Sequence, residues 1–184
     1  MGYFSMFPSI AYQFAGENNS TLLTDIVKRV KVRDAILTSA ALYSTYFVKD
    51  GETPHVLASK YYGDSNLHWI LLLTNTIIDP NFDWPMHSNV LSLYCQNKYG
   101  SHLYAVHHYE LISPFSWRNG MVMPHDVFAG DFGADLYDSD TEEVLPVSNT
   151  EFEEKINDQK RQIALFKPDL VTEFITEFSQ MINQ

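Results

Sequence analysis

The sequence predicts an α+β protein with a strand-helix-helix-strand core. An extended N-terminal arm precedes this core, and an acidic loop/β insertion and C-terminal amphipathic helices follow it. Three observations lead to this fold class: a β-branched and aromatic run, helix-capping residues directly after it, and an apolar stripe of helical period near the C-terminus. We therefore divide the chain into an arm with a first helix, a core with an inserted helix, an acidic region and C-terminal helices, at residues 1–41, 42–112, 113–148 and 149–184.

Residues 1–20 predict an extended arm, because their large apolar side chains follow no helical period. Such an arm has to lie on a surface, either that of its own domain or that of a neighbouring subunit. A helix is expected over 24–41, where apolar residues recur at roughly 3.6-residue spacing. Its basic cluster is either a solvated face or a docking site for an acidic surface, and comprises Lys28, Arg29, Lys31 and Arg33.

The core begins with a predicted strand over 42–48. Thr53 is placed to cap a helix with Pro54 at its first position, and Gly63 is placed to end that helix. A second short helix, closed by Asn75, is apolar on almost all sides and is therefore expected to be buried.

Beyond the core helices, a further helix is expected over 88–99 and a strand over 103–112. Residues 113–148 predict only short strands and loops.

The C-terminal segment predicts two helices. Thr150 and Glu153 form a capping-box pattern, and apolar residues at helical spacing continue this helix to Phe166. Pro168 interrupts the pattern, because the residue before a proline avoids the α region. The second helix carries an apolar stripe of Leu170, Val171, Phe174, Ile175, Phe178, Met181 and Ile182. This stripe packs either on the core of the chain or on a partner.

The charge of the chain disfavours two classes of partner. It has 12 Lys and Arg against 23 Asp and Glu, a net charge of −11, which disfavours nucleic acid and anionic membrane surfaces. The longest apolar run, 69–73, is too short to cross a bilayer, and the N-terminus lacks the regions of a signal peptide. No lysine or arginine occurs between Arg118 and Lys155, so this acidic segment is either a solvated loop or a surface for a basic partner.

Residues that could carry chemistry form no recognisable pattern. His107 and His108 are neighbours on a predicted strand and would point to opposite faces. No zinc-ligand spacing, nucleophile elbow or phosphate-binding glycine loop occurs. Cys95, the single cysteine, is expected to be a buried hydrophobe in a protein of a reducing compartment. We therefore expect no enzymatic activity, no metal and no cofactor.

An ordered series of motifs resembles a known family. Its first part resembles a LysM-type module and consists of Tyr46 to Pro54, Leu57-Ala58, Tyr61-Tyr62-Gly63, Asn66, Trp69 and Asn75. With Asp79-Pro80, Trp84, the strand from Leu103 and the Phe174/Phe178 helix, the series resembles the LysM-like baseplate wedge proteins of contractile-tailed bacteriophages, product fifty-three of the T-even type. The likeness is weakest from about 113 to 148.

This resemblance implies a structural subunit of the virion tail baseplate, assembled in the host bacterial cytoplasm and without catalytic residues. It implies contacts with other wedge proteins, namely central bundle subunits and a small sheath-like subunit, and with neighbouring wedges around the hub. The candidate partner-interface residues are Tyr3, Phe4, Phe7, Phe174, Phe178 and Met181.

The alternative is a LysM-type peptidoglycan-binding module of a phage lysis or cell-wall protein. Two departures from an ordinary module count against it. Asn75 leads into a long loop and a helix instead of a closing strand, and Pro54 stands where an apolar residue is usual.

Overall fold

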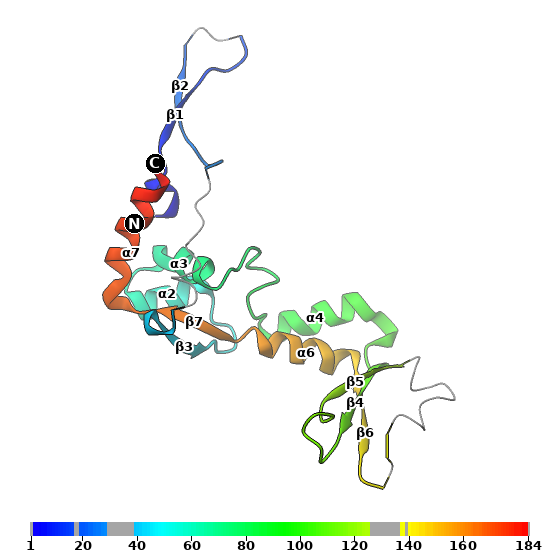
Figure 1. Cartoon of the computed structure of the whole chain (residues 1–184). Coiled ribbons are helices and arrows are strands. Elements are labelled where there is room, and N and C mark those ends of the chain that lie inside the picture. Colours follow the sequence, from blue (N-terminus) through cyan, green and yellow to red (C-terminus); the bar gives the residue numbers. More distant parts are fainter. Residues whose placement is uncertain (1, 17–18, 29–38, 126–136, 139, 184) are drawn as a thin grey trace. The chain divides into compact units, whose positions relative to one another are not determined.

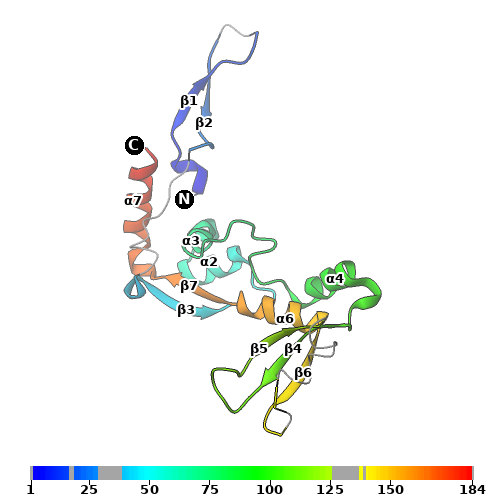
Figure 2. The ribbon, with the colours of Figure 1, turned by 45° about the vertical axis from the view of Figure 1, so that its right-hand side comes forward.

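The computed structural model describes residues 2–16, 19–28, 39–125, 137–138 and 140–183. The chain forms two compact units, of which the first comprises Met1–Trp84 with Arg161–Gln184 and the second Pro85–Lys160. In sequence, the second unit is therefore inserted between the two parts of the first. Both units combine helices and strands (Figures 1 and 2), which confirms the α+β class.

A two-stranded antiparallel sheet organises the first unit. Strand β3 (Tyr43–Phe47) pairs with β7 (Gln162–Phe166), with Tyr43 opposite Phe166 and Phe47 opposite Gln162. The two strands lie side by side in Figures 1 and 2. The expectation of one helix continuing to Phe166 is therefore wrong, because its last residues form β7.

Two helices follow β3 in the first unit, before the chain enters the second unit. Helix α2 (Pro54–Tyr62) begins where the sequence predicts, since the Thr53 hydroxyl accepts a hydrogen bond from Val56 N at 3.3 Å. It ends at Gly63, whose φ of 77° lies in the left-handed region. A 3-10 turn, η3 (Ser65–Leu67), leads into the short helix α3 (His68–Thr74), whose apolar residues are largely buried as expected.

The C-terminal helix α7 (Val171–Ile182) follows a 3-10 turn, η6 (Pro168–Leu170). Its apolar stripe confirms the predicted second helix. The first unit contains two clusters of buried side chains. One surrounds α7 and contains Met6, Phe7, Leu67, Trp69, Ile70, Phe166, Val171, Phe174, Phe178 and Ile182. The other lies against α2 and β7 and contains Val48, Leu57, Ala58, Leu71, Trp84, Ile163 and Leu165.

The N-terminal residues form a turn and a hairpin, so the expectation of a wholly extended arm is only partly right. The 3-10 turn η1 (Tyr3–Met6) is followed by β1 (Ser9–Tyr12), which pairs antiparallel with β2 (Thr21–Thr24). The helix expected over 24–41 is contradicted at its start, because Thr24 belongs to β2. Its remainder lies mostly outside the described residues, as do three of the four basic residues of its cluster. A further 3-10 turn, η2 (Ala40–Leu42), precedes β3.

The second unit contains helices α4 and α6 and a three-stranded sheet. Helix α4 (Ser88–Tyr99) and strand β4 (Val106–Ile112) confirm the predicted helix and strand, and η4 (Gly100–His102) follows α4. The sheet has the order β5-β4-β6, with β5 (Met121–Pro124) and β6 (Glu143–Ser148) both antiparallel to β4.

Helix α6 (Asn149–Gln159) carries a capping box, but not the predicted one. Ser148 and Glu151 form the box, with the Ser148 hydroxyl accepting from Glu151 N at 3.3 Å. The Thr150 hydroxyl instead donates to the Leu103 carbonyl at 3.0 Å, and Glu153 is buried. The helix therefore starts one residue before Thr150, because a tertiary contact takes the hydroxyl that the pattern assigned to the cap.

Candidate interaction surfaces

The six predicted interface residues do not share one surface. Phe7, Phe174 and Phe178 are buried in the core cluster around α7, with Phe178 fully inaccessible. Tyr3 is half-buried against the same cluster, and Met181 is half-buried on α7. Of the six, only Phe4 is exposed, at 58%.

Aromatic contacts explain this burial. The Phe178 ring lies 5.0 Å from the Trp69 ring of α3 and 5.8 Å from the Tyr3 ring of η1. The Phe174 ring lies 5.0 Å from that of Phe166 on β7. Because these rings come from four different elements, the stripe of α7 packs on the chain's own core. A role at a partner interface is still a proposal for the three predicted residues that keep accessible surface, Tyr3, Phe4 and Met181.

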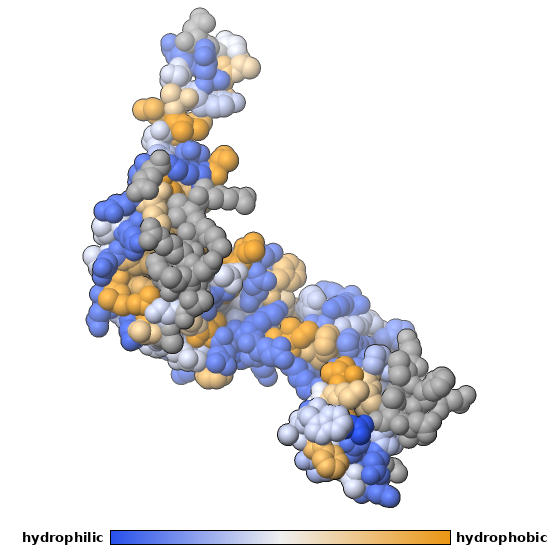
Figure 3. All heavy atoms as spheres, viewed as in Figure 1, coloured by the Kyte–Doolittle hydropathy of each residue, from blue (hydrophilic) through white to orange (hydrophobic). Residues whose placement is uncertain are grey.

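The hairpin of β1 and β2 is an exposed apolar surface. The sequence predicted an apolar arm over its first strand, but not the pairing with a second strand. All eight of its strand residues are exposed, and Figure 3 shows apolar side chains over this hairpin. The exposed large apolar residues in and next to it are Ile10, Tyr12, Phe14, Leu22, Leu23, Ile26 and Val27. The available signal was the alternation of Ile10 and Tyr12 before the turn at Gly16, whose φ is 91°.

A second group of exposed aromatic residues lies in the second unit. Trp117 and Tyr104 are each 80% exposed, and Phe115 is 53% exposed. The Arg118 guanidinium lies 5.6 Å from the Trp117 ring centre, a cation–π contact. Exposed tryptophan and arginine are typical of residues at protein interfaces.

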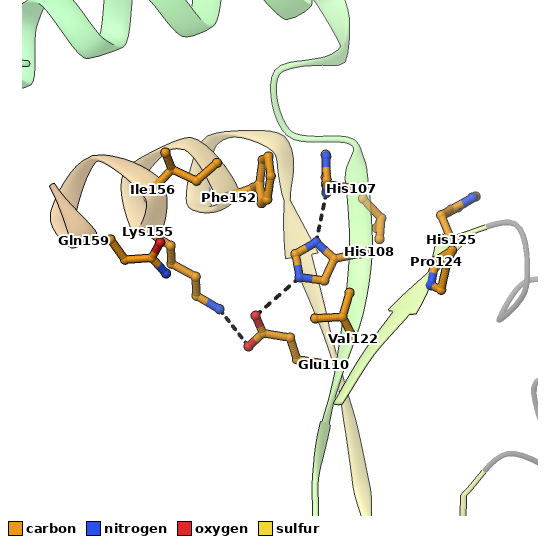
Figure 4. Close-up of a pocket in the computed structure, with 11 residues that line it drawn as sticks. His107, His108, Glu110, Val122, Pro124, His125, Phe152, Lys155, Ile156 and Gln159 are labelled. Carbon is orange, nitrogen blue, oxygen red and sulfur yellow. Dashed lines mark hydrogen bonds and ion pairs between the residues drawn. The ribbon is translucent and has the colours of Figure 1, made fainter. Parts of the chain in front are cut away.

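A cavity of about 690 Å³ in the second unit brings histidines together (Figure 4). His107 Nδ1 lies 2.9 Å from His108 Nδ1, and His108 Nε2 lies 3.3 Å from Glu110 Oε1. Lys155 Nζ of α6 lies 2.7 Å from Glu110 Oε2, which completes a chain of four polar side chains. The His107 ring also stacks on Phe152 of α6, with ring centres 3.8 Å apart.

The expectation that His107 and His108 point to opposite faces is wrong. The pairing of β4 with β6 shifts between Val106 and His108, so the strand has an irregularity at His107. A bulge of this kind breaks the alternation of faces and lets neighbouring side chains approach each other. The alternation rule on which the prediction rested therefore does not hold at this position.

The charges around this cavity are mutually compensated. Burial lowers the pKa of His107, and the neighbouring His108 acts in the same direction. The hydrogen bond from Lys155 holds the pKa of Glu110 below its usual value. The lysine and the glutamate of this cavity therefore bind each other, and the Glu110 carboxylate also contacts His108.

Parts of the acidic segment are neither solvated nor open to a basic partner. Glu153 is buried and accepts hydrogen bonds from Lys98 Nζ at 2.6 Å and Tyr99 Oη at 2.7 Å. Burial acts to raise the pKa of Glu153, but these two hydrogen bonds outweigh it and lower the pKa. Glu142 is also buried and accepts from the Ser113 hydroxyl at 2.8 Å. Residues 126–136, which carry more of the segment's acids, lie outside the described residues.

Cys95 is buried, as predicted. Among the described residues, no cluster of three or more histidine, cysteine or acidic side chains could hold a metal ion. Within the same ranges, no helix combines the length and apolar character needed to span a bilayer.

Comparison with known proteins gives the class of this molecule. It is a structural baseplate protein of a bacteriophage virion, since the sequence model described as "Base plate wedge protein 53" matches residues 2–181. That match runs through nearly the whole chain, and the chain therefore belongs to the base plate wedge protein 53 family.

A relative in Enterobacteria phage T4, "Baseplate wedge protein gp53", is 34% identical over 86 residues. The aligned part covers 44% of this chain and 43% of the T4 protein, so the chain matches less than half the length of that relative.

Proposed function

We propose that this protein is a non-catalytic structural subunit of the inner baseplate wedge, which links wedge proteins to one another and joins neighbouring wedges during tail assembly. The observation that carries the proposal is the family match over residues 2–181. The exposed apolar residues of the β1–β2 hairpin and the exposed aromatic residues of the second unit support it, because such side chains are costly to leave in water.

The partners in this proposal are the central bundle subunits and the small sheath-like subunit of the wedge. The peptidoglycan-binding alternative is not favoured, because both the family and the T4 relative are baseplate wedge proteins by name.

We further propose that β3, α2, α3 and β7 together form a LysM-like core. Two contacts support a single packed module of these elements. The Asn75 side chain at the end of α3 binds both backbone groups of Ala164 in β7 at 2.8 Å. Trp84 Nε1 donates to the Glu52 carbonyl at 2.7 Å, just before α2. In this proposal the last strand of the module is β7, which follows the second unit in sequence.

A complementation experiment tests the proposed function. A phage defective in the gene for this chain is grown with and without the wild-type chain supplied in trans, and its particles are purified and imaged. We expect wedges that fail to join into baseplates without the chain, and complete baseplates containing it when it is supplied. Complete and infectious tails that form without the chain would refute the structural role.

A further inference from the structure

The β1–β2 hairpin has one unprotected edge. Asp25 N donates to the Pro8 carbonyl at 2.8 Å, which marks these two residues as a hydrogen-bonded pair. Because hydrogen-bonded and non-hydrogen-bonded pairs alternate along antiparallel strands, the register places Ile10 opposite Leu23 as the next hydrogen-bonded pair. The backbone groups of Ser9 and Ala11 on β1 therefore point away from β2.

The opposite edge of the hairpin is partly closed. Ala11 pairs with Leu22 and Ser9 with Thr24, so the backbone groups of Leu22 and Thr24 point outward from β2. The Thr24 carbonyl, however, already accepts a hydrogen bond from Ile26 N at 2.9 Å. Among the described residues, none forms a hydrogen bond with the outward groups of Ser9 or Ala11. The edge of β1 is thus the more open of the two.

The sequence of β1 does nothing to block this edge. Proteins commonly protect free edges with lysine, proline, a bulge or a covering segment. Residues Ser9–Tyr12 contain no charged residue and no proline, and the two side chains at outward-pointing positions, Ser9 and Ala11, are small. Within Ser9–Tyr12, neither a charged side chain nor a proline would hinder a strand that pairs with β1.

One face of the hairpin is also apolar and uncovered. Ile10, Tyr12 and Leu23 share this face by register and are 42%, 48% and 38% exposed. An isolated two-stranded sheet is only marginally stable in water, and a third strand or a packed layer is what usually stabilises it. The hairpin is therefore incomplete by itself.

We propose that the free edge of β1 receives an extended segment of another, less acidic baseplate chain, which adds a third strand to the hairpin. That segment is uncharged within the strand, because neither β1 nor β2 contains a charged residue. Its alternate apolar side chains pack beside Ile10 and Tyr12. A second copy of this chain is disfavoured as the occupant, since each copy carries a net charge of −11. This inference rests on the proposed function.

A matched pair of proline variants tests the edge. Ala11→Pro removes an outward N–H from β1, and Leu22→Pro removes the N–H of its paired residue on β2. Neither N–H serves the hairpin itself, and proline is tolerated at such edge positions. Each variant is co-expressed with an equal amount of wild-type chain during infection by the defective phage. Mass spectrometry then measures the variant to wild-type ratio in purified baseplates, and thermal melting of each isolated full-length variant checks its fold.

We expect Ala11→Pro to be incorporated about tenfold less than wild type, as the loss of a backbone hydrogen bond at an interface predicts. Leu22→Pro should be incorporated like wild type, and both variants should melt like wild type. Equal incorporation of Ala11→Pro and wild type would overturn the inference, and so would an equal deficit in Leu22→Pro.

The occupant is tested by sedimentation of the isolated wild-type chain. We expect a monomer. A dimer that Ala11→Pro dissociates would identify a second copy as the occupant and overturn the hetero-partner assignment. Failure of the proposed function would look different, since the wild-type chain itself would then be absent from baseplates.

Discussion

Replacing Phe178 by alanine tests whether the stripe of α7 belongs to the chain's own core. Phe178 has no exposed surface, and its ring contacts rings from η1, α3 and α7 itself. Removal of a fully buried phenylalanine ring costs about 3–5 kcal/mol in unfolding free energy, because transfer and cavity terms add. We expect the upper part of that range, since aromatic neighbours on separate elements cannot easily collapse into the space.

Phe4→Ala is the matched control, because it removes the same ring from a 58% exposed position. Its expected cost is below about 1 kcal/mol, as for most exposed substitutions. Urea unfolding is followed by tryptophan fluorescence in a Trp117→Phe background. The two remaining tryptophans, Trp69 and Trp84, both lie in the first unit and report on its unfolding.

A Phe178→Ala cost below about 1 kcal/mol, equal to that of Phe4→Ala, would refute the core assignment of the stripe. In that case, α7 would again be a candidate for a helix that binds a partner. A large cost would also mean that charged substitutions on this stripe act by unfolding the protein, so they could not identify an interface.

Two further predictions concern polar contacts. Asn75→Ala should destabilise the first unit by about 1–3 kcal/mol, because it leaves both backbone groups of Ala164 without their partner. Urea unfolding measures this, with the exposed loop residue Asn81→Ala as control, and equal stability of the two variants would contradict the reasoning. The second prediction concerns His107, whose pKa is lower in the folded chain than in the unfolded one. Its contribution to stability is therefore present above pH about 6.5 and is lost as pH falls through its folded value. The drop in melting temperature between pH 7 and pH 5 should be smaller in His107→Gln, and identical pH profiles would exclude this effect.

Helix ends could be predicted where the residues next to the helix mark them. Thr53, Pro54 and Gly63 define the start and end of α2 without help from the rest of the chain. The stripe of α7 and the burial of Cys95 followed in the same way from periodicity. The family could also be recognised without a structure, because its motifs are short and their order along the chain can be read directly from the sequence.

Local patterns thus predicted the α+β class, both ends of helix α2 and the family. Where these elements pair depends on the tertiary structure. Residues 162–166 become strand β7 because β3, far earlier in the chain, and Asn75 offer hydrogen bonds that outweigh a helical spacing. The shift in pairing at His107 decides which side chains meet in the cavity, and the contacts of Phe178 decide that the stripe faces inward. Each of these outcomes depends on residues distant in sequence, and a local pattern contains no information about which distant partner it will meet.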